Sequence, residues 1–283
     1  MESISTLLTN DTTAKPFLRW AGGKTWLLKY LDAFLPKKFN NYHEPFIGGG
    51  SVFIYLKSTG KIKGNAYLSD KNEDLINAYN ILKDQPEELI KILGEYKNEK
   101  DFYYFIRDQK FTDQLRQAGQ FIFLNRTSFN GIYRVNLKGE YNVPYGFKKY
   151  KQLFDFENLR SLSRLLSNTS MRFRDFAETI NEIKKEDLVF LDPPYTVAHG
   201  NNGFVKYNQK IFSWQDQERL KEFLEEIVKK EAYFILTNAA HESISNLFND
   251  VTKPHEINRY SVVGGVGAER REISEYIFTN CDL

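Results

Sequence analysis

A short apolar run that stops at two prolines places the strongest constraint on how this chain folds. Residues 187–191 (Asp-Leu-Val-Phe-Leu) are typical of a buried strand, and Asp192-Pro193-Pro194-Tyr195 follows directly. Proline fixes φ and lacks a backbone N–H, so the strand is expected to end here. Ligands of open α/β sheets bind beyond the carboxyl ends of the strands. The sequence therefore predicts that Asp192 lies on the rim of a binding site.

The same tetrapeptide sets hydrogen-bond acceptors beside an aromatic ring. The Asp192 carboxylate and the proline carbonyls accept hydrogen bonds, while Tyr195 adds a flat π face. This combination suits an amino group on a planar ring, such as the exocyclic amine of a nucleobase. On these residues alone, a proline turn with a solvated Asp and a packed Tyr is an equally good interpretation.

Composition excludes several classes of protein. With 283 residues, of which 41% are hydrophobic, the chain can bury a sizeable core, and no stretch approaches the roughly 20 apolar residues of a membrane span. Residues 1–14 are polar, so we expect a flexible tail and not a secretory signal. Cys281 is the only cysteine, which excludes an internal disulfide, and four scattered histidines make a metal site unexpected. We expect a cytoplasmic enzyme that uses no metal.

Charge is unevenly distributed along the chain. Residues 126–172 contain nine Lys or Arg and three Asp or Glu, a net charge of +6, whereas the whole chain carries +2. Aromatic residues lie among these cations, among them Phe129, Tyr133 and Phe147. Cations interleaved with aromatics are typical of a surface that binds a nucleic acid.

Hydrophobic periodicity predicts an α/β core that is interrupted by an insert. We expect residues 1–75 and 169–283 to form the core, and residues 76–168 to form a mainly helical second domain. The insert also carries a predicted β-hairpin, in which residues 132–136 pair with 141–143 across Lys138-Gly139. In the second part of the core, strands are expected at residues 170–174, 187–191, 232–237, 257–263 and 273–279, and a helix at 214–230.

A glycine-rich loop and a later acidic residue indicate a nucleoside-containing cofactor. Gly48, Gly49 and Gly50 follow a predicted strand, where they let the backbone approach a ligand closely. Asp70 comes 22 residues after Gly48, at the predicted end of a second strand, where a carboxylate can accept the hydroxyls of a ribose. A plain turn with an N-capping Asp is the structural alternative.

Four ordered motifs resemble those of a known family. They are Phe17-Leu18-Arg19-Trp20-Ala21-Gly22-Gly23-Lys24, Glu44-Pro45-Phe46-Ile47-Gly48-Gly49-Gly50, Asn142-Val143-Pro144-Tyr145-Gly146 and Asp192-Pro193-Pro194-Tyr195. In content and order they resemble the Dam-type (D12 class, α group) DNA adenine-N6 methyltransferases. The resemblance runs from about residue 15 to the C-terminus. It implies a Rossmann-like methyltransferase core with the target-recognition domain inserted between the cofactor loop and the catalytic motif.

The resemblance assigns roles residue by residue. It implies S-adenosylmethionine as cofactor and catalysis by the tetrapeptide Asp192, Pro193, Pro194 and Tyr195. Cofactor contacts are implied for Trp20, Gly22, Gly23, Lys24, Glu44, Phe46, Gly48, Gly50, Asp70, Asp175, Phe176 and Asp192. DNA contacts are implied for Arg19, Phe129, Asn130, Ile132, Arg134, Asn136 and Pro144, and the cations Lys148 and Lys149 are expected at phosphates.

The expected reaction is transfer of a methyl group to N6 of an adenine that is flipped out of duplex DNA, in a GATC-like or related short site. Acceptors on Asp192 and Pro193 would hold the amino group, and Tyr195 would stack on the base. The expected partners are double-stranded DNA and a separate cognate restriction endonuclease, and the expected state is a monomer or weak dimer. The alternatives are an rRNA adenine-N6 methyltransferase, a cytosine-N4 enzyme, which would more often carry Ser at position 192, and a DNA-binding module with a degenerate active site.

One position departs from the pattern. Relatives that read GATC typically follow the glycine of the third motif with Arg, which can contact guanine, but here Gly146 is followed by Phe147. Either Lys148 substitutes for this Arg from the next position along, or the base pair is read differently or loosely, in which case the target departs from GATC.

Overall fold

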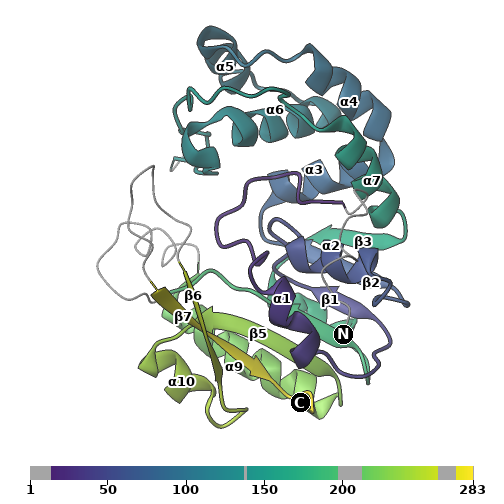
Figure 1. Cartoon of the computed structure of the whole chain (residues 1–283), viewed down its shortest axis with the longest axis vertical. Coiled ribbons are helices and arrows are strands. Elements are labelled where there is room, and N and C mark those ends of the chain that lie inside the picture. Colours follow the sequence, from purple (N-terminus) through teal and green to yellow (C-terminus); the bar gives the residue numbers. More distant parts are fainter. Residues whose placement is uncertain (1–13, 137–138, 197–211, 261–271, 283) are drawn as a thin grey trace, which may run out of the picture. The chain divides into compact units, whose positions relative to one another are not determined.

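The computed structural model describes residues 14–136, 139–196, 212–260 and 272–282. The described chain divides into two compact units, whose elements are labelled in Figure 1. Unit 1 comprises residues 1–23, 48–61 and 74–168, and unit 2 comprises residues 24–47, 62–73 and 169–283. The tail expected at residues 1–14 lies outside the described residues except for Ala14, which is buried.

Unit 2 is built on a seven-stranded sheet, which confirms the predicted α/β class. The strands are β1 (Tyr42–Glu44), β2 (Ala66–Asp70), β3 (Thr169–Phe173), β4 (Leu188–Leu191), β5 (Tyr233–Ala239), β6 (His255–Tyr260) and β7 (Glu272–Thr279). Their order is β3-β2-β1-β4-β5-β7-β6, and β7 pairs antiparallel with both β5 and β6. The five neighbouring strands β3, β2, β1, β4 and β5 are parallel to one another.

The strand order positions the site. From β1 the chain proceeds outward to β2 and β3, and then returns to the other side of β1 with β4 and β5. In doubly wound sheets, ligands bind at the point where the order reverses, beyond the carboxyl ends of the strands. Here the reversal lies between β1 and β4, which end at Glu44 and Leu191. Asp192 is the next residue after β4, as predicted.

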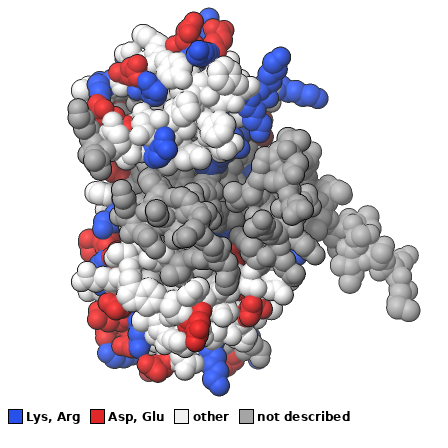
Figure 2. Space-filling model, turned by 90° about the vertical axis from the view of Figure 1, so that its left-hand side faces the viewer, with Lys and Arg blue, Asp and Glu red and all other residues white. Residues whose placement is uncertain are grey.

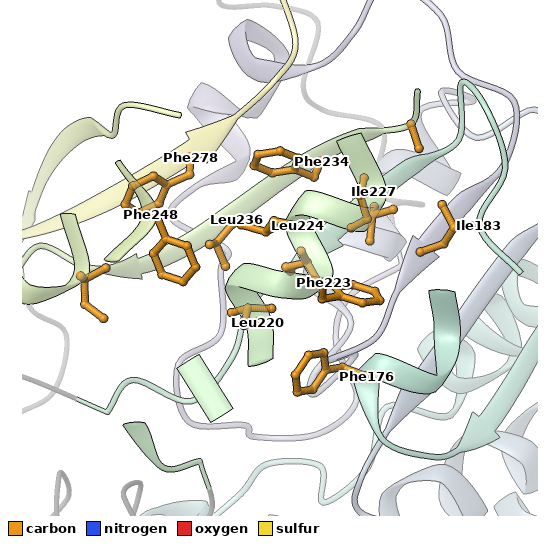
Figure 3. Packing of buried hydrophobic residues seen from close by; sticks show 14 of the residues in the cluster. Phe176, Ile183, Leu220, Phe223, Leu224, Ile227, Phe234, Leu236, Phe248 and Phe278 are labelled. Carbon is orange, nitrogen blue, oxygen red and sulfur yellow. The ribbon is translucent and has the colours of Figure 1, made fainter. Parts of the chain in front are cut away.

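A hydrophobic core supports the β4–β5 part of the sheet. Side chains two positions apart in a strand point to the same face of the sheet. Val189 and Leu191 of β4 are such a pair, as are Phe234 and Leu236 of β5, and all four belong to one buried cluster. The helix α9 (Trp214–Lys229) contributes Leu220, Phe223, Leu224 and Ile227 to the same cluster (Figure 3). The helix begins at a capping box between Ser213 and Asp216. The core thereby fixes β4, and with it the position of the tetrapeptide that follows.

The remaining helices of unit 2 are short. They are α1 (Leu28–Leu31), η2 (Asp32–Phe34), η4 (Phe176–Asn181) and α10 (Glu242–Phe248). Pro36 follows the first two, where the sequence predicts the stop.

Unit 1 is helical over most of its described length. Its helices are α2 (Ser51–Ser58), α3 (Glu73–Asp84), α4 (Pro86–Glu95), α5 (Lys100–Arg107), α6 (Gln114–Thr127), η3 (Phe129–Gly131) and α7 (Phe156–Leu166). Apolar residues at helical spacing are buried, for example Leu89, Ile90 and Leu93 of α4. The sequence boundary at residue 76 differs from the boundary between the units, because α2 packs with α7. That residues 76–168 act as a target-recognition domain stays a prediction.

Among the described residues, the predicted hairpin is present as isolated antiparallel pairs. Val135 pairs with Tyr141, and Ser128 pairs with Tyr145, without regular strands around them. Asn136 closes the first pair, because its N–H donates to the Glu140 carbonyl over 2.8 Å and its side chain accepts from the Glu140 N–H. Lys138 of the expected turn lies outside the described residues. No helix in the described ranges is long and apolar enough to cross a membrane.

Candidate active site

Asp192 is held by a buried lysine and a buried threonine. The Lys24 ammonium lies 2.8 Å from Asp192 Oδ1, and the Thr237 hydroxyl donates to the same oxygen over 2.8 Å. The Lys24 side chain is 4% exposed and that of Asp192 is 19% exposed, so the pair lies at a rim. Among the described residues, no donor contacts Oδ2. Of the two carboxylate oxygens that the sequence offers as acceptors, Oδ1 is thus already occupied.

Tyr195 is anchored at its hydroxyl and covered on its ring. The hydroxyl donates to Oε2 of Glu275. The Lys24 ammonium lies 4.8 Å from the centre of the Tyr195 ring, within the range of a cation–π contact. One face of the ring expected to stack on a base is therefore directed at Lys24.

Glu275 is a functional candidate that the sequence interpretation missed. It lies in β7, its side chain is 2% exposed, and its Oε2 is 3.8 Å from the Lys24 ammonium. The sequence does contain a signal for it, namely an acidic residue within a largely apolar run that is expected to form a strand. A charged side chain that is buried in a strand usually has polar or charged partners, which points to a role for Glu275. Thr237 was missed in the same way, as a polar residue in the run that becomes β5.

A second buried network fixes the residue after the tetrapeptide. Gln217 of α9 donates to the Thr196 hydroxyl over 2.7 Å and accepts from the Asn238 amide over 3.0 Å. All three side chains are buried. Neighbouring residues of β5, Thr237 and Asn238, thus hold the two ends of the segment from Asp192 to Thr196. Pro193 is buried and Pro194 partly so.

The electrostatics of this cluster shift two pKa values. Burial raises the pKa of Asp192 above its ordinary value and the Glu275 carboxylate adds to this rise, although Lys24 and Thr237 oppose it. Burial and the nearby carboxylates also raise the pKa of Tyr195 well above its ordinary value. Tyr195 is consequently a neutral donor throughout the physiological range.

Two of the predicted cofactor-binding residues are the last residues of their strands, Glu44 in β1 and Asp70 in β2. Glu44 is buried and accepts from the Tyr42 hydroxyl over 2.6 Å. Asp70 is the last residue of β2, and its Oδ1 accepts from the Asn72 N–H over 3.0 Å. Phe46 stacks on Phe176 with 5.3 Å between ring centres. The structure therefore brings Glu44, Asp70 and Asp192 to the carboxyl edge of one sheet.

Asp175 and Phe176 are engaged in contacts within unit 2. Asp175 accepts from the Arg219 guanidinium over 2.6 Å and from the Ala177 N–H over 3.0 Å. Although burial raises the pKa of Asp175, the hydrogen bonds from Arg219 and Ala177 bring it below its ordinary value. The Phe176 ring is buried beneath Arg219, whose guanidinium carbon is 4.9 Å from the ring centre. An adenine contact at Asp175 would share its carboxylate with Arg219.

In unit 1, the glycine loop packs against Trp20. A Cβ at Gly48 would lie 2.8 Å from Trp20 Cδ1, and Gly48 has a φ of +45°, so only glycine fits. Gly50, with a φ of +67°, is the residue before α2, where the sequence predicts a turn into a helix. Gly22 also has a positive φ of 81°, and Gly23 donates to the Trp20 carbonyl over 3.4 Å. The Trp20 ring in turn stacks on Tyr133.

Comparison with known proteins identifies the family. Residues 20–262 match the family model described as "D12 class N6 adenine-specific DNA methyltransferase". The chain belongs to this family. It is an adenine-specific DNA methyltransferase, and membership implies the use of S-adenosylmethionine.

Individual relatives agree with this assignment. The chain is 33% identical over 287 residues to the type II methyltransferase M1.LlaDCHI of Lactococcus lactis subsp. cremoris, covering 98% of this chain and 99% of that protein. It is 38% identical over 244 residues to the type II methyltransferase M.MjaIII of Methanocaldococcus jannaschii, covering 80% and 84%. The DNA adenine methylase of Escherichia coli (strain K12) is 30% identical over 270 residues, covering 93% and 94%. The adenine-N6 DNA interpretation is thus confirmed over the rRNA, cytosine-N4 and non-catalytic alternatives.

The expected DNA-binding residues of this methyltransferase lie in unit 1. Arg19 is fixed through its backbone, which exchanges two hydrogen bonds of 2.8 Å with the Asn125 side chain. A Cβ at Gly131 would lie 2.7 Å from Arg19 Cδ, so the glycine gives the arginine stem its place. Phe129 and Ile132 are 53% and 37% exposed, which is unusual for large apolar side chains. Asn130 between them has a φ of +56°.

The following segment holds the other expected contacts. Arg134 donates to Asn142 over 2.8 Å, and the Phe129 N–H donates to the Pro144 carbonyl over 2.8 Å. Lys148 and Lys149 are exposed, and Lys and Arg side chains project into solvent on the face drawn in Figure 2. Phe147 is 70% exposed. Exposed apolar and cationic side chains thus follow one another along residues 129–149.

Proposed function

We propose that this methyltransferase methylates N6 of an adenine extruded from duplex DNA, and that Asp192 holds the amino group through Oδ2. The observation that carries the proposal is the division of labour at the carboxylate. Lys24 and Thr237 both occupy Oδ1, and no described donor contacts Oδ2. Oδ2 is therefore available as an acceptor on a residue that cannot rotate freely.

The residues at the sheet edge fit the implied cofactor. Asp70 ends β2, where a carboxylate suits ribose hydroxyls, and Phe46 offers an aromatic ring at the neighbouring strand. Lys24, Asp192 and Glu275 together carry a net charge of −1 when ionised, which suits a sulfonium cation. When bound, S-adenosylmethionine supplies a methyl group that is activated for transfer by its sulfonium.

The chain itself contributes positioning more than chemistry. The lone pair of an adenine amino group is delocalised into the ring, so the nitrogen is a poor nucleophile. Acceptance of its hydrogens by Asp192 Oδ2 and the Pro193 carbonyl would favour a pyramidal nitrogen with its lone pair free to attack. Transfer then depends on alignment, which is what a rigid strand end and two prolines can supply. Extrusion of the base costs a few kcal/mol.

The exposed residues of unit 1 support a role in DNA binding. We propose that Phe129 wedges into the base stack, that Arg134 and Ile132 contact bases, and that Lys148 and Lys149 contact phosphates. A wedge of this kind would compensate for the stacking that is lost when the base leaves the duplex. The same proposal includes a cognate restriction endonuclease that acts as a separate protein. It also includes a methyltransferase that is a monomer or a weak dimer.

The experiment is methylation of duplex DNA from a methylation-deficient host, with modified adenines mapped by sequencing. Asp192→Ala is expected to abolish methylation while S-adenosylmethionine-independent DNA binding persists, because Asp192 lies at a rim. Asp155→Ala is the matched control, since this carboxylate caps α7 in unit 1, where it accepts from Asn158. Retention of more than a few per cent of the wild-type rate by Asp192→Ala would refute the assigned role.

A further inference from the structure

We propose that Glu275 is a positioning residue of the methyl-transfer site, which fixes the Tyr195 hydroxyl and the Lys24 ammonium and thereby the orientation of Asp192. The inference deepens the proposed function and rests on it. It starts from a buried carboxylate for which the motifs of the sequence provide no role.

The strand register brings Glu275 to the site. Glu275 is paired with Ala239 in the antiparallel β5–β7 ladder, and Ile277 is paired with Thr237. Because directly paired side chains and side chains two residues apart share a face, Glu275 and Thr237 point to the same side of the sheet. Thr237 reaches Asp192 over 2.8 Å on that side. Glu275 therefore faces the cluster from β7, which lies next to β5, the strand whose Thr237 contacts Asp192.

Its contacts close a circuit of four groups. Glu275 Oε2 accepts the Tyr195 hydroxyl and lies 3.8 Å from the Lys24 ammonium. Lys24 is in turn 2.8 Å from Asp192 Oδ1 and 4.8 Å from the centre of the Tyr195 ring. Lys24 thus sits among two carboxylates and an aromatic face. Loss of Glu275 would remove the carboxylate that accepts the Tyr195 hydroxyl and that lies beside the Lys24 ammonium.

Burial of the Glu275 carboxylate costs free energy, which its partners must offset. The side chain is 2% exposed, and an ionised carboxylate in such a place is costly unless it is paired and hydrogen-bonded. An apolar residue at this position, next to the apolar Tyr276, Ile277 and Phe278, would avoid that cost. Tyr195 and Lys24 both meet this carboxylate, and both belong to the proposed site.

The charge of Glu275 also bears on the carboxylate that touches the substrate. Glu275 contributes to the raised pKa of Asp192, whereas Lys24 and Thr237 lower it. Glu275→Gln keeps an oxygen that can accept the Tyr195 hydroxyl but removes the charge. The acidic limb of the pH–rate profile should therefore move to lower pH in this variant. A residue with a purely structural role would not move that limb.

The test combines kinetics with stability in the full chain. For Glu275→Gln we expect the single-turnover methylation rate on duplex DNA to fall by about 10- to 100-fold, because small displacements of aligned groups are costly. KM for DNA should stay within about twofold. In a Tyr195→Phe background the same substitution should cost less, since the hydroxyl that Glu275 fixes is already gone.

Asp187→Asn is the matched control. Asp187 is a buried carboxylate directly before β4 that accepts from His43 over 2.9 Å. It lies at the opposite end of the strand from Asp192, about 16 Å away at 3.3 Å per residue. This variant should lower the melting temperature and leave the methylation rate and pH profile unchanged.

Each outcome decides the question. If Glu275→Gln lowers only the melting temperature, as Asp187→Asn does, the positioning role is overturned. If Glu275→Gln does not fold, Tyr195→Phe decides alone: a rate within twofold of wild type overturns the proposal, and a loss of tenfold or more supports it. Absence of adenine methylation by the wild-type protein would instead refute the proposed function itself.

Discussion

The Lys24 ammonium and Asp192 Oδ1 lie 2.8 Å apart at the carboxyl end of β4, and this pair joins the first sequence motif to the last. Lys24 ends the glycine-containing motif near the N-terminus, while Asp192 begins the tetrapeptide 168 residues later. Because the lysine takes one carboxylate oxygen, it also determines which oxygen is left for a substrate. The two motifs are therefore coupled through this ion pair.

Replacement of the lysine should reveal how strongly the cluster depends on its single cation. In Lys24→Met, Asp192 and Glu275 would face each other without the ammonium between them. Removal of one partner from a buried ion pair typically destabilises by about 3–5 kcal/mol, and we expect a loss of about 3 kcal/mol together with loss of methylation. Urea denaturation and a methylation assay measure the two effects.

Lys29→Met is the control for this substitution. Lys29 lies in α1, is exposed, and contacts the Tyr30 ring with its ammonium at 4.4 Å from the ring centre. An exposed substitution of this kind should change the free energy of unfolding by less than about 0.5 kcal/mol. Equal stability of the two variants would contradict a structural role of the Lys24–Asp192 pair.

The pH dependence of catalysis should follow Asp192. Burial raises the pKa of this carboxyl, so its ionised form is lost at a higher pH than that of an exposed aspartate. Only the ionised form presents Oδ2 as a pure acceptor, and the rate should therefore fall as the pH drops through the raised pKa. A single-turnover pH–rate profile measures this. An acidic limb at or below the ordinary aspartate value of about 3.9 would contradict it.

How far sequence alone leads is clearest at the tetrapeptide and its supports. The position of Asp192 at a strand end follows from a local pattern, an apolar run and two prolines, and the structure confirms it. Thr237 and Glu275 reach Asp192 and Tyr195 only through the register of β4, β5 and β7, which no local pattern encodes. Local signals thus predict which residue stands at the site, but not what holds it there.

The hairpin of unit 1 illustrates the opposite error. Alternating residues around Val135 and Tyr141 predict strands, but in the structure the pairing reduces to isolated bridges. The Tyr141 hydroxyl donates to the Ile132 carbonyl over 2.6 Å, and Arg134 turns to Asn142. The Asn136 N–H still donates to the Glu140 carbonyl and the Asn142 N–H to the Arg134 carbonyl, but among the described residues these backbone bonds do not extend into a regular ladder.

Salt dependence should separate phosphate contacts from base contacts. Neutralisation of the exposed Lys148, Lys149 and Lys151 to Ala should weaken duplex binding and reduce the slope of log affinity against log salt by about 2–3, through fewer released counterions. The preferred sequence should not change, because phosphate contacts position the protein and do not read bases. Fluorescence anisotropy at several salt concentrations measures the slope.

A matched set of lysines controls for net charge. Lys37, Lys38 and Lys63 are also exposed and belong to unit 2, outside the basic segment. Their neutralisation removes the same charge and should leave the slope within about 1 of wild type. If the first triple variant instead methylated different sites, its lysines would be base readers.

The last prediction concerns Phe147 and the recognised sequence. The side chain is 70% exposed, meets Tyr145 edge-on at 4.9 Å between ring centres, and has a φ of +54°, a left-handed conformation that is unusual for an aromatic residue. An exposed, strained phenylalanine gains little from folding, so we expect the ring to contact DNA. A phenyl ring cannot donate to guanine, and the missing contact typically corresponds to about 1–3 kcal/mol of discrimination. This methyltransferase should therefore tolerate changes at one outer base pair of a GATC-like site.

Phe147→Arg should narrow the mapped methylation sites. Phe147→Gly, which relieves the positive φ, should keep stability and weaken DNA binding. Strict GATC methylation by the wild type, with no tolerance at the outer base pair, would show that Phe147 does not alter specificity.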